Sequence, residues 1–263
     1  MVALADRVRD PGLRDDEPMS GSSSGRKVLV TGASSGIGSA VAEAIVADGG
    51  RVTLLARSTD TLAEQADRLG DAAVAVPADV TDPDALAAAI RRGATAMGGL
   101  DAIVCSAGLV RPGGLATTEP ADWKAMFDVN VLGVLNTVHG ALGHLRAADT
   151  ADVIVISSMS GRRRSSVEMG IYSASKFAVH TLADSLREEL SADGVRVTVI
   201  SPGYVDTPIF DGVGDDETRT RYQDAVATQG LDPDVVAAQV VHALAQPAGV
   251  NLVEIALLST DQH

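Results

Sequence analysis

Residues 31–38 read TGASSGIG and connect a short apolar run, Lys27–Thr31, to a segment whose apolar residues recur at helical spacing, residues 37–48. Glycines at such a strand-to-helix turn remove side chains where a pyrophosphate must approach the backbone, and they tolerate positive φ angles. The N-terminus of the helix offers N–H groups and a partial positive charge to the same anion. The stretch therefore predicts a dinucleotide-binding turn, with a packing turn that holds no ligand as the alternative.

Segments of strand and helix character alternate along the chain after this turn. Thr59–Leu69 has the pattern of a second helix, and Asp82 followed by Pro83 is typical of the start of a third. The apolar runs that predict further strands span residues 52–56, 73–76, 102–106, 153–157, 195–201 and 252–257. These runs are continuous rather than alternating, which indicates strands buried on both faces of a parallel sheet. The sequence predicts a single-domain α/β fold, a Rossmann-type doubly wound parallel sheet of about seven strands with helices on both faces.

The composition excludes several classes of protein. The 263 residues are 46% hydrophobic and 21% charged, as in a globular protein with ample material for a core. The formal charge of −14 would repel a polyphosphate backbone, so we expect no nucleic-acid partner. The apolar runs fall far short of the roughly 20 residues that span a bilayer, so we expect no membrane partner. A single cysteine, Cys105, excludes an intrachain disulfide and fits a cytoplasmic location. We expect Cys105 to be a buried packing residue, and we expect no metal site.

The N-terminal stretch differs from the rest of the chain. Residues 1–25 are polar, mix acidic and basic side chains, and end in SGSSSG, a flexible-linker composition. They contain no apolar stretch of the kind found in secretory signals. We expect a disordered arm over residues 1–25 and one folded domain over residues 26–263.

The end of the second predicted strand bears on which dinucleotide binds. An acidic residue there would bind the 2′-hydroxyl of NAD and repel a 2′-phosphate. Residues 55–58 read LARS, so the carboxylate is missing and Arg57 follows instead. Arginine pairs well with phosphate and stacks on adenine. The sequence favours NADP(H) over NAD(H), with a solvated surface Arg57 as the alternative.

Tyr172 and Lys176 occur in the stretch YSASK, which opens a helical segment running to Leu190. Their spacing of four residues places both side chains on one face of the helix. A phenol has a pKa near 10, and a neighbouring ammonium is expected to lower that pKa. Such a tyrosine can give a proton to a carbonyl oxygen or take one from an alcohol. Ser157 and Ser158 end a strand shortly before it, at the sheet edge where ligands of doubly wound folds bind.

These motifs together resemble those of the short-chain dehydrogenase/reductase family. The motifs are TGASSGIG, Ser158, YSASK and PGYVDT at residues 202–207, in this order. The resemblance extends from about Arg26 to the C-terminus. It implies an enzyme that transfers a hydride between a nicotinamide and a small carbonyl or alcohol substrate, such as an aldehyde or a hydroxy acid.

The resemblance implies a role for individual residues. Tyr172 resembles the general acid/base of the family, and Lys176 would lower its pKa and bind the nicotinamide ribose. Ser158 would hydrogen-bond the substrate carbonyl oxygen, and Asn130 would hold a water of the proton relay. The implied cofactor-binding residues are Gly32, Ser34, Ser35, Gly36, Ile37, Gly38, Arg57, Ser58, Asp79, Val80, Ala107, Gly108, Asn130, Tyr172, Lys176, Pro202, Gly203, Val205 and Thr207.

One stretch departs from the family pattern. The family commonly has Asn-Asn-Ala-Gly after the fourth strand, where this chain has Cys105, Ser106, Ala107 and Gly108. The small residues Ala107 and Gly108 are retained, but Cys105 cannot replace the hydrogen bonds of an amide. The departure puts the local rigidity of this stretch in question.

Two charged segments bear on the substrate. We expect residues 208–230 to cover the pocket as a lid. The lid is rich in acidic residues, which are expected on a solvated face and would disfavour polyanionic substrates if they faced the pocket. Arg162, Arg163 and Arg164 lie between Ser158 and Tyr172. They favour a solvated or subunit-contact cluster, with a clamp for a small keto or hydroxy acid as the alternative.

The resulting hypothesis is an NADP-dependent oxidoreductase that acts on a small molecule. Its alternatives are a regulatory protein that senses NADP without chemistry and a structural scaffold. The resemblance implies a homo-oligomer, a dimer or a tetramer, formed through the helices that contain Asn130 and Tyr172.

Overall fold

The computed structural model describes residues 23–164 and 166–262. In this part of the chain, parallel strands form one seven-stranded sheet in the order β3-β2-β1-β4-β5-β6-β7. The strands are β1 (Lys27–Thr31), β2 (Arg51–Leu55), β3 (Ala73–Ala75), β4 (Ala102–Cys105), β5 (Ala151–Ile156), β6 (Val195–Pro202) and β7 (Glu254–Leu257). Strand β1 lies inside the sheet. Strands β2 and β3 follow on one side of it, and β4 to β7 follow on the other side. Ligands of such sheets bind where this reversal occurs, beyond the carboxyl ends of β1 and β4.

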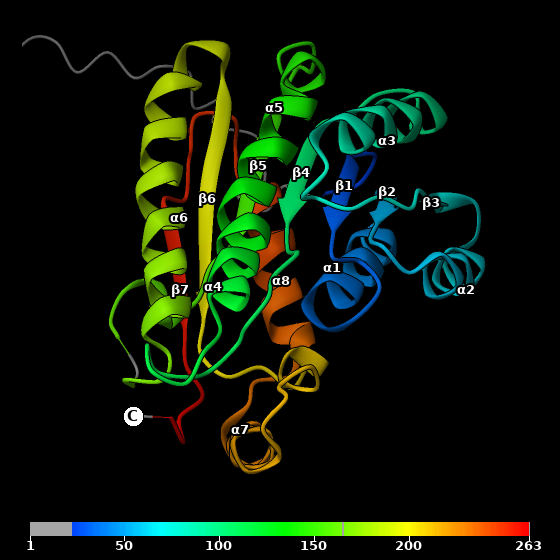
Figure 1. The fold of residues 1–263 in the computed structure, drawn as a ribbon. Coiled ribbons are helices and arrows are strands. Elements are labelled where there is room, and N and C mark those ends of the chain that lie inside the picture. Colours follow the sequence, from blue (N-terminus) through cyan, green and yellow to red (C-terminus); the bar gives the residue numbers. More distant parts are fainter. Residues whose placement is uncertain (1–22, 165, 263) are drawn as a thin grey trace, which may run out of the picture.

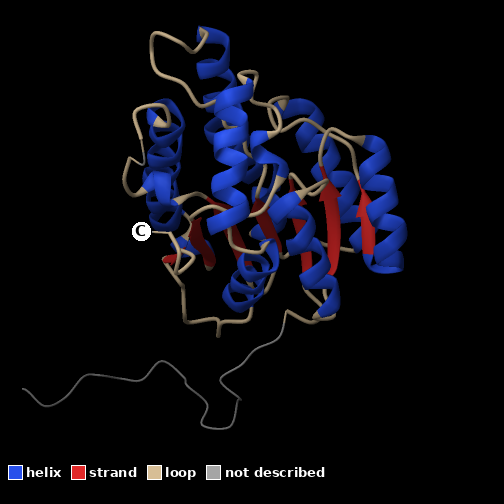
Figure 2. Ribbon diagram, turned by 90° about the horizontal axis from the view of Figure 1, so that it is seen from below, coloured by secondary structure: helices blue, strands red, loops and turns tan. Residues whose placement is uncertain are grey.

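Helices cover both faces of the sheet (Figures 1 and 2). The helices are α1 (Gly36–Ala47), α2 (Thr59–Leu69), α3 (Pro83–Met97), α4 (Pro120–Phe127), α5 (Gly133–Leu145), α6 (Gly170–Glu189), α7 (Asp216–Gln229) and α8 (Pro233–Leu244). One face buries its apolar residues against α1, α2 and α8, and the other against α3, α5 and α6. Helix α7 lies beyond the carboxyl edge of the sheet (Figure 1). The predicted doubly wound α/β sheet is thus confirmed.

Local signals placed several elements correctly. The predicted strand Lys27–Thr31 and helix Thr59–Leu69 have the observed bounds. Asp82 caps α3 as predicted, because its Oδ1 accepts a hydrogen bond of 3.0 Å from the N–H of Ala85. Strand β5 begins at Ala151, before the predicted start, because the carboxylate of Asp152 is buried in an ion pair with Arg196 inside the sheet.

The packed body begins earlier than predicted. Ser23 is buried, and both its N–H and its hydroxyl donate hydrogen bonds of 2.6 Å to Oδ2 of Asp48. The N–H of Gly25 donates to the carbonyl of Gly49. Residues 23–25, expected to belong to the arm, therefore contact the chain near residues 48 and 49, while the rest of the predicted arm, residues 1–22, lies outside the described residues. Among the described helices, none combines the length and the hydropathy needed to span a membrane.

Candidate active site

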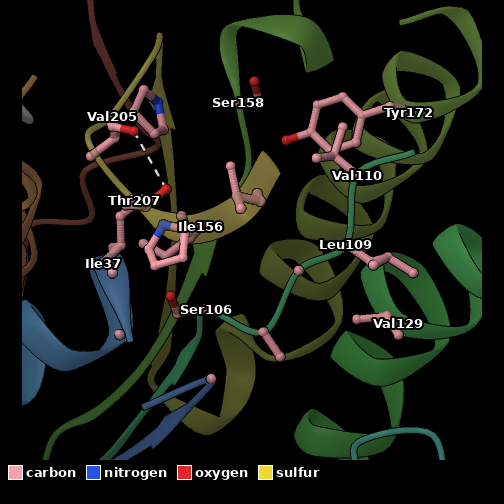
Figure 3. A pocket seen from close by; sticks show the side chains of 18 of the residues that line it. Ile37, Ser106, Leu109, Val110, Val129, Ile156, Ser158, Tyr172, Val205 and Thr207 are labelled. Atoms are coloured by element: carbon pink, nitrogen blue, oxygen red, sulfur yellow. Dashed lines mark hydrogen bonds between the residues drawn. The ribbon is translucent and has the colours of Figure 1, made fainter. Parts of the chain in front are cut away.

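A cavity of about 880 Å³ opens at the carboxyl edge of the sheet. Its walls come from the turn after β1, the ends of β2, β4, β5 and β6, and the start of α6. Figure 3 shows Tyr172 and Val110 on one side of it, and Val205, Thr207 and Ile37 on the other. Every site residue predicted from the sequence lines this cavity except Asn130. The topology thus brings together residues from widely separated parts of the chain.

The glycines of the first turn are required by close backbone contacts. A Cβ on Gly32 would lie 2.9 Å from Cα of Ala107, and one on Gly38 would lie 2.2 Å from the carbonyl oxygen of Gly32. Gly32 and Gly36 have φ angles of +67° and +52°. Ser35, the N-cap of α1, forms no side-chain cap, so the first N–H groups of the helix lack a side-chain acceptor and face the cavity. This turn fits a bound pyrophosphate, because it offers bare backbone and helix N–H groups to an anion.

The opposite end of the cavity is formed by Arg57, Ser58, Asp79 and Val80. Oδ1 of Asp79 accepts hydrogen bonds from the N–H and the hydroxyl of Thr81, at 2.9 and 2.8 Å. Those bonds fix the carboxylate at the cavity wall. Arg57 forms no ion pair with any residue that the structure describes, so its guanidinium remains available to an anionic ligand.

Tyr172 and Lys176 lie on one face of α6, as their spacing predicted, and both are buried. Nζ of Lys176 lies 5.9 Å from the centroid of the Tyr172 ring and donates a hydrogen bond of 3.0 Å to the carbonyl of Ile156. Ser158 follows β5, and its Oγ accepts a hydrogen bond of 3.0 Å from the N–H of Ser160. Figure 3 shows the Ser158 hydroxyl and the Tyr172 phenol on the same side of the cavity. A hydroxyl, a phenol and an amine are thus collected at one end.

The pKa of Tyr172 differs from the expectation. Burial raises it to about 12, and hydrogen bonding by the Ser158 hydroxyl opposes this rise. Burial also lowers the pKa of Lys176 to about 8, which the nearby Cys105 opposes. Burial is therefore the larger influence on the pKa of Tyr172, and it acts against the lowering that the sequence predicts. The structure holds Tyr172 as a neutral phenol at physiological pH.

Asn130 is the one predicted site residue that does not line the cavity. It lies in η2 (Asp128–Leu132), a π-helical turn between α4 and α5, and its side chain is buried behind the cavity wall. Its Oδ1 accepts from the N–H of Leu109 at 2.8 Å, while its Nδ2 donates to the Leu109 carbonyl and to Oγ of Ser175. The side chain therefore fixes the loop after β4 onto α6. The resemblance alone gave no signal of these contacts.

The departure after β4 is compensated by β1. Oγ1 of Thr31 accepts hydrogen bonds from the N–H groups of Ser106 and Ala107, at 3.1 and 3.2 Å. Cys105 is buried as expected, and burial raises its pKa to about 12, so the thiol stays protonated and is not a nucleophile. The stretch is thus held without an amide at Cys105.

The arginine cluster divides into two parts. Arg162 does not line the cavity; its Nε lies 3.5 Å from Oε1 of Glu254 in β7. Arg163 and Arg164 are exposed, as expected of a solvated cluster, and they also line the cavity, as the alternative of a clamp requires. Arg111 also lines it and was not foreseen, because nothing in its local sequence marks it.

In the lid segment, apolar residues line the cavity and the acidic residues lie away from its wall. It starts with η5 (Pro208–Phe210), which lines the cavity, and Phe210 stacks on Tyr222 of α7 with ring centroids 4.8 Å apart. None of the acidic residues predicted in the lid lines the cavity. These side chains therefore do not oppose an anionic substrate at the cavity wall. Among the described residues, no group of His, Cys, Asp or Glu is arranged to hold a metal ion.

Comparisons with known proteins support a family assignment. Residues 26–218 match the profile of the short chain dehydrogenase family. An uncharacterized oxidoreductase of Staphylococcus saprophyticus is 37% identical over 231 residues, which are 86% of this chain and 94% of that protein. The glycine betaine reductase of Emericella nidulans is 35% identical over 91% of this chain, but the matched region is only 19% of that much longer protein.

Solved structures agree with this assignment. A serine dehydrogenase complexed with NADP+ superposes with a TM-score of 0.81 at 27% identity, covering 90% of this chain and 96% of that one. A short-chain dehydrogenase/reductase from Burkholderia phymatum in complex with NAD also gives a TM-score of 0.81 at 27% identity, over 89% of both chains. The chain belongs to the short-chain dehydrogenase/reductase family of NAD(P)-dependent oxidoreductases.

Proposed function

We propose that the protein is an NADP-dependent oxidoreductase that interconverts a small carbonyl compound and its alcohol. The observation that carries this proposal is the collection of Ser158, Tyr172 and Lys176 at one end of a single cavity. The same cavity begins at a glycine turn that fits a pyrophosphate. A bound nicotinamide dinucleotide would supply the two electrons and the hydrogen that a carbonyl carbon requires.

The cavity offers residues along its length to hold such a dinucleotide. The glycine turn and the N-terminus of α1 would bind the pyrophosphate, and Asp79 and Val80 would contact the adenine. At the other end, Lys176 would bind the nicotinamide ribose, while Val205 and Thr207 would hold the carboxamide. Oγ1 of Thr207 donates to the Val205 carbonyl at 3.4 Å, which ties these two residues together (Figure 3).

The chemistry at the reacting oxygen belongs to Ser158 and Tyr172. The Ser158 hydroxyl would donate a hydrogen bond to the substrate carbonyl and so hold it in place. Because burial raises the pKa of Tyr172 to about 12, its phenol keeps a proton to give to the oxygen as negative charge develops there. An alkoxide is more basic than a phenolate, so this transfer is favourable. The shift therefore favours reduction as the direction in which Tyr172 acts as an acid.

Preference for NADP(H) is proposed on the basis of Arg57. It lines the cavity directly after β2, where no carboxylate is present to repel a 2′-phosphate, and it has no counter-ion among the described residues. The solved relatives include one complex with NADP+ and one with NAD, so the residues of this chain carry the proposal.

Self-association as a dimer or tetramer is proposed from exposed apolar side chains. Phe127, Leu132 and Phe177 are 38%, 48% and 45% exposed. They belong to α4, η2 and α6, which pack together on one side of the sheet (Figure 1). Large exposed apolar side chains gathered on neighbouring elements are typical of a protein contact surface.

Replacement of Tyr172 by phenylalanine tests the proposed chemistry. Tyr172→Phe removes only the hydroxyl, so we expect NADPH to bind as it does to the wild type. Turnover should fall by at least about a hundredfold, the lower range for loss of general acid catalysis. The assay is NADPH oxidation over a panel of keto acids, aldehydes, quinones and ketones, with NADPH affinity from fluorescence titration.

Three outcomes can be separated. Wild-type turnover in Tyr172→Phe contradicts the assignment of this residue. Binding of NADPH by the wild type without oxidation by any carbonyl favours the alternative of a sensing protein. Failure to bind either dinucleotide contradicts the proposed function as a whole.

A further inference from the structure

The charge of the cavity is opposite to that of the whole chain. The formal net charge of the protein is −14. The charged side chains that line the cavity are nevertheless almost all cationic: Arg57, Asp79, Arg111, Arg163, Arg164 and Lys176. A cleft lined by one sign of charge concentrates ligands of the other sign, even on a protein whose net charge opposes them.

Most of these cations have a defined partner or position. Arg57 lies at the end formed with Ser58 and Asp79. Nζ of Lys176 donates to the Ile156 carbonyl. Arg111 donates from Nη1 to the carbonyl of Val110, and its Nε lies 3.7 Å from Oδ1 of Asp122. Arg111 is thus engaged by protein acceptors, and Arg57 and Lys176 are assigned to the proposed dinucleotide.

Arg163 and Arg164 are the exception. They follow η3 (Met159–Gly161), directly after Ser158, and so lie on the segment between the proposed carbonyl-binding hydroxyl and α6. Both are exposed, and neither pairs with a carboxylate among the described residues. Two exposed guanidinium groups without a counter-ion at the wall of a cavity favour an anionic ligand.

Part of the cavity wall is apolar. Val110, Met169 and Phe210 line the cavity and pack with Tyr172 in one buried cluster. Figure 3 shows Val110 beside the Tyr172 ring. A ligand of this cavity can therefore meet both a hydrophobic surface and positive charge.

We propose that the substrate is an oxo acid, whose carboxylate is bound by Arg163 and Arg164 while its carbonyl lies at Ser158 and Tyr172. This inference rests on the proposed function and deepens it. In the reduction, reduced nicotinamide dinucleotide gives two electrons and one hydrogen to the oxo carbon. The oxygen takes the proton of Tyr172, solvent returns a proton to the phenol, and the carboxylate is unchanged. The products are the hydroxy acid and the oxidised dinucleotide.

The same geometry disfavours substrates of opposite charge. A quaternary ammonium compound would meet the guanidinium groups of Arg163 and Arg164 at the rim, and like charges repel at this range. The acidic residues of the lid lie away from the cavity wall, so they do not offset this repulsion. The inference therefore predicts that this chain does not share the substrate of a relative that acts on a cation.

Matched pairs of substrates test the inference. The series 2-oxo-, 3-oxo-, 4-oxo- and 5-oxohexanoate, each with its neutral methyl ester, varies the distance between the carbonyl and the charge. We expect kcat/KM with NADPH to be higher for the acid than for its ester by at least about tenfold at the best spacing, as for a charge-assisted pair. Raising the salt concentration should reduce this ratio, because screening weakens the contact of exposed charges.

Variants then assign the effect to the two arginines. Arg163→Gln with Arg164→Gln should lower kcat/KM for the preferred acid by at least about tenfold and leave its ester within about threefold. Arg162→Gln is the matched control, because it removes the same charge from the adjacent position but outside the cavity wall. The hydroxy acid should bind the wild type in the presence of NADP+ by calorimetry, and should bind the double variant at least about tenfold more weakly.

The outcomes distinguish this inference from the function on which it rests. Equal rates for acids and esters, or a double variant that behaves like Arg162→Gln, overturn the inference and leave the oxidoreductase assignment intact. Unchanged binding of the hydroxy acid by the double variant overturns it as well. Absence of turnover with acids and esters alike overturns the proposed function, and this inference with it.

Discussion

Arg57 is a single side chain on which the proposed choice of dinucleotide depends. Arg57→Ala should weaken NADPH binding by at least about tenfold, because a guanidinium–phosphate contact is lost, while NADH binding should change little. The measurement is fluorescence titration of both dinucleotides against the wild type and the variant. Arg51→Ala is a suitable control, since Arg51 begins the same strand and donates to the Met97 carbonyl away from the cavity. Equal losses for NADPH and NADH would contradict the role given to Arg57.

The lowered pKa of Lys176 predicts how the rate of the proposed reaction depends on pH. Burial lowers its pKa to about 8, so its ammonium is present below that pH and is lost as the pH rises through it. Tyr172, with a pKa of about 12, keeps its proton over the same range. If the ammonium assists the proton transfer, kcat/KM for reduction should be high below pH 8 and should fall above it with the loss of one proton. A profile that stays flat to pH 10 would contradict this assignment.

The sequence located these two residues but did not give their ionisation. The spacing of Tyr172 and Lys176 was enough to place them on one helical face, because that depends only on helix geometry. Their pKa shifts depend on desolvation by segments far away in the chain, such as β5, which local patterns do not contain. Asn130 shows the same limit, since its contacts with Leu109 and Ser175 arise from the tertiary fold.

A buried ion-pair cluster lies near the amino ends of β1, β5 and β6, at the edge of the sheet opposite the cavity. Asp152 in β5 accepts two hydrogen bonds from Arg196 in β6, at 2.8 and 2.9 Å, and one of 2.6 Å from Arg26, which precedes β1. The carboxylate is 3% exposed, so it neutralises buried guanidinium groups that have no other carboxylate within reach among the described residues. The carboxylate thus links β5 to β6 and to the residue that precedes β1.

Loss of that carboxylate should destabilise the fold without affecting the site. Asp152→Asn leaves two largely buried cations without a counter-charge, so the free energy of unfolding should fall by about 3–5 kcal/mol. Asp193→Asn is the control: its pair with Arg146 is more exposed, and its loss should cost less than about 1 kcal/mol. Urea unfolding of both variants provides the measurement. Equal effects would show that burial does not set the strength of the Asp152 pair.

Element order was easier to predict than the ends of elements. Apolar runs and the cap at Asp82 identified the alternation of strands and helices, because each signal is local. Strand β5 was placed too late because a charged residue, Asp152, interrupts its pattern, and only the distant Arg196 explains how that charge is buried. The sequence left Arg163 and Arg164 between a solvated cluster and a clamp for a similar reason, since the cavity wall that they line is built from other segments.

Considered as a whole, the molecule combines a negative exterior with a cationic cavity. The charge of −14 opposes association of two copies, and the effect is strongest at low salt because the Debye length is then long. Any self-association must therefore come from apolar contact. The exposed side chains of Phe127, Leu132 and Phe177 provide such a surface on the side of the sheet covered by α5 and α6.

Disruption of this surface should convert the protein to monomers. Leu132→Asp with Phe177→Asp adds two negative charges to an apolar contact between like-charged copies, and burying an unpaired carboxylate is costly. Val235→Asp is the matched control, because Val235 is 42% exposed on α8, which covers the opposite face of the sheet. Sedimentation velocity should show a dimer or tetramer for the wild type and Val235→Asp, and a monomer for the double variant. Higher salt should strengthen the wild-type assembly, since it screens the repulsion between copies. A double variant that sediments like the wild type would place the contact elsewhere on the molecule.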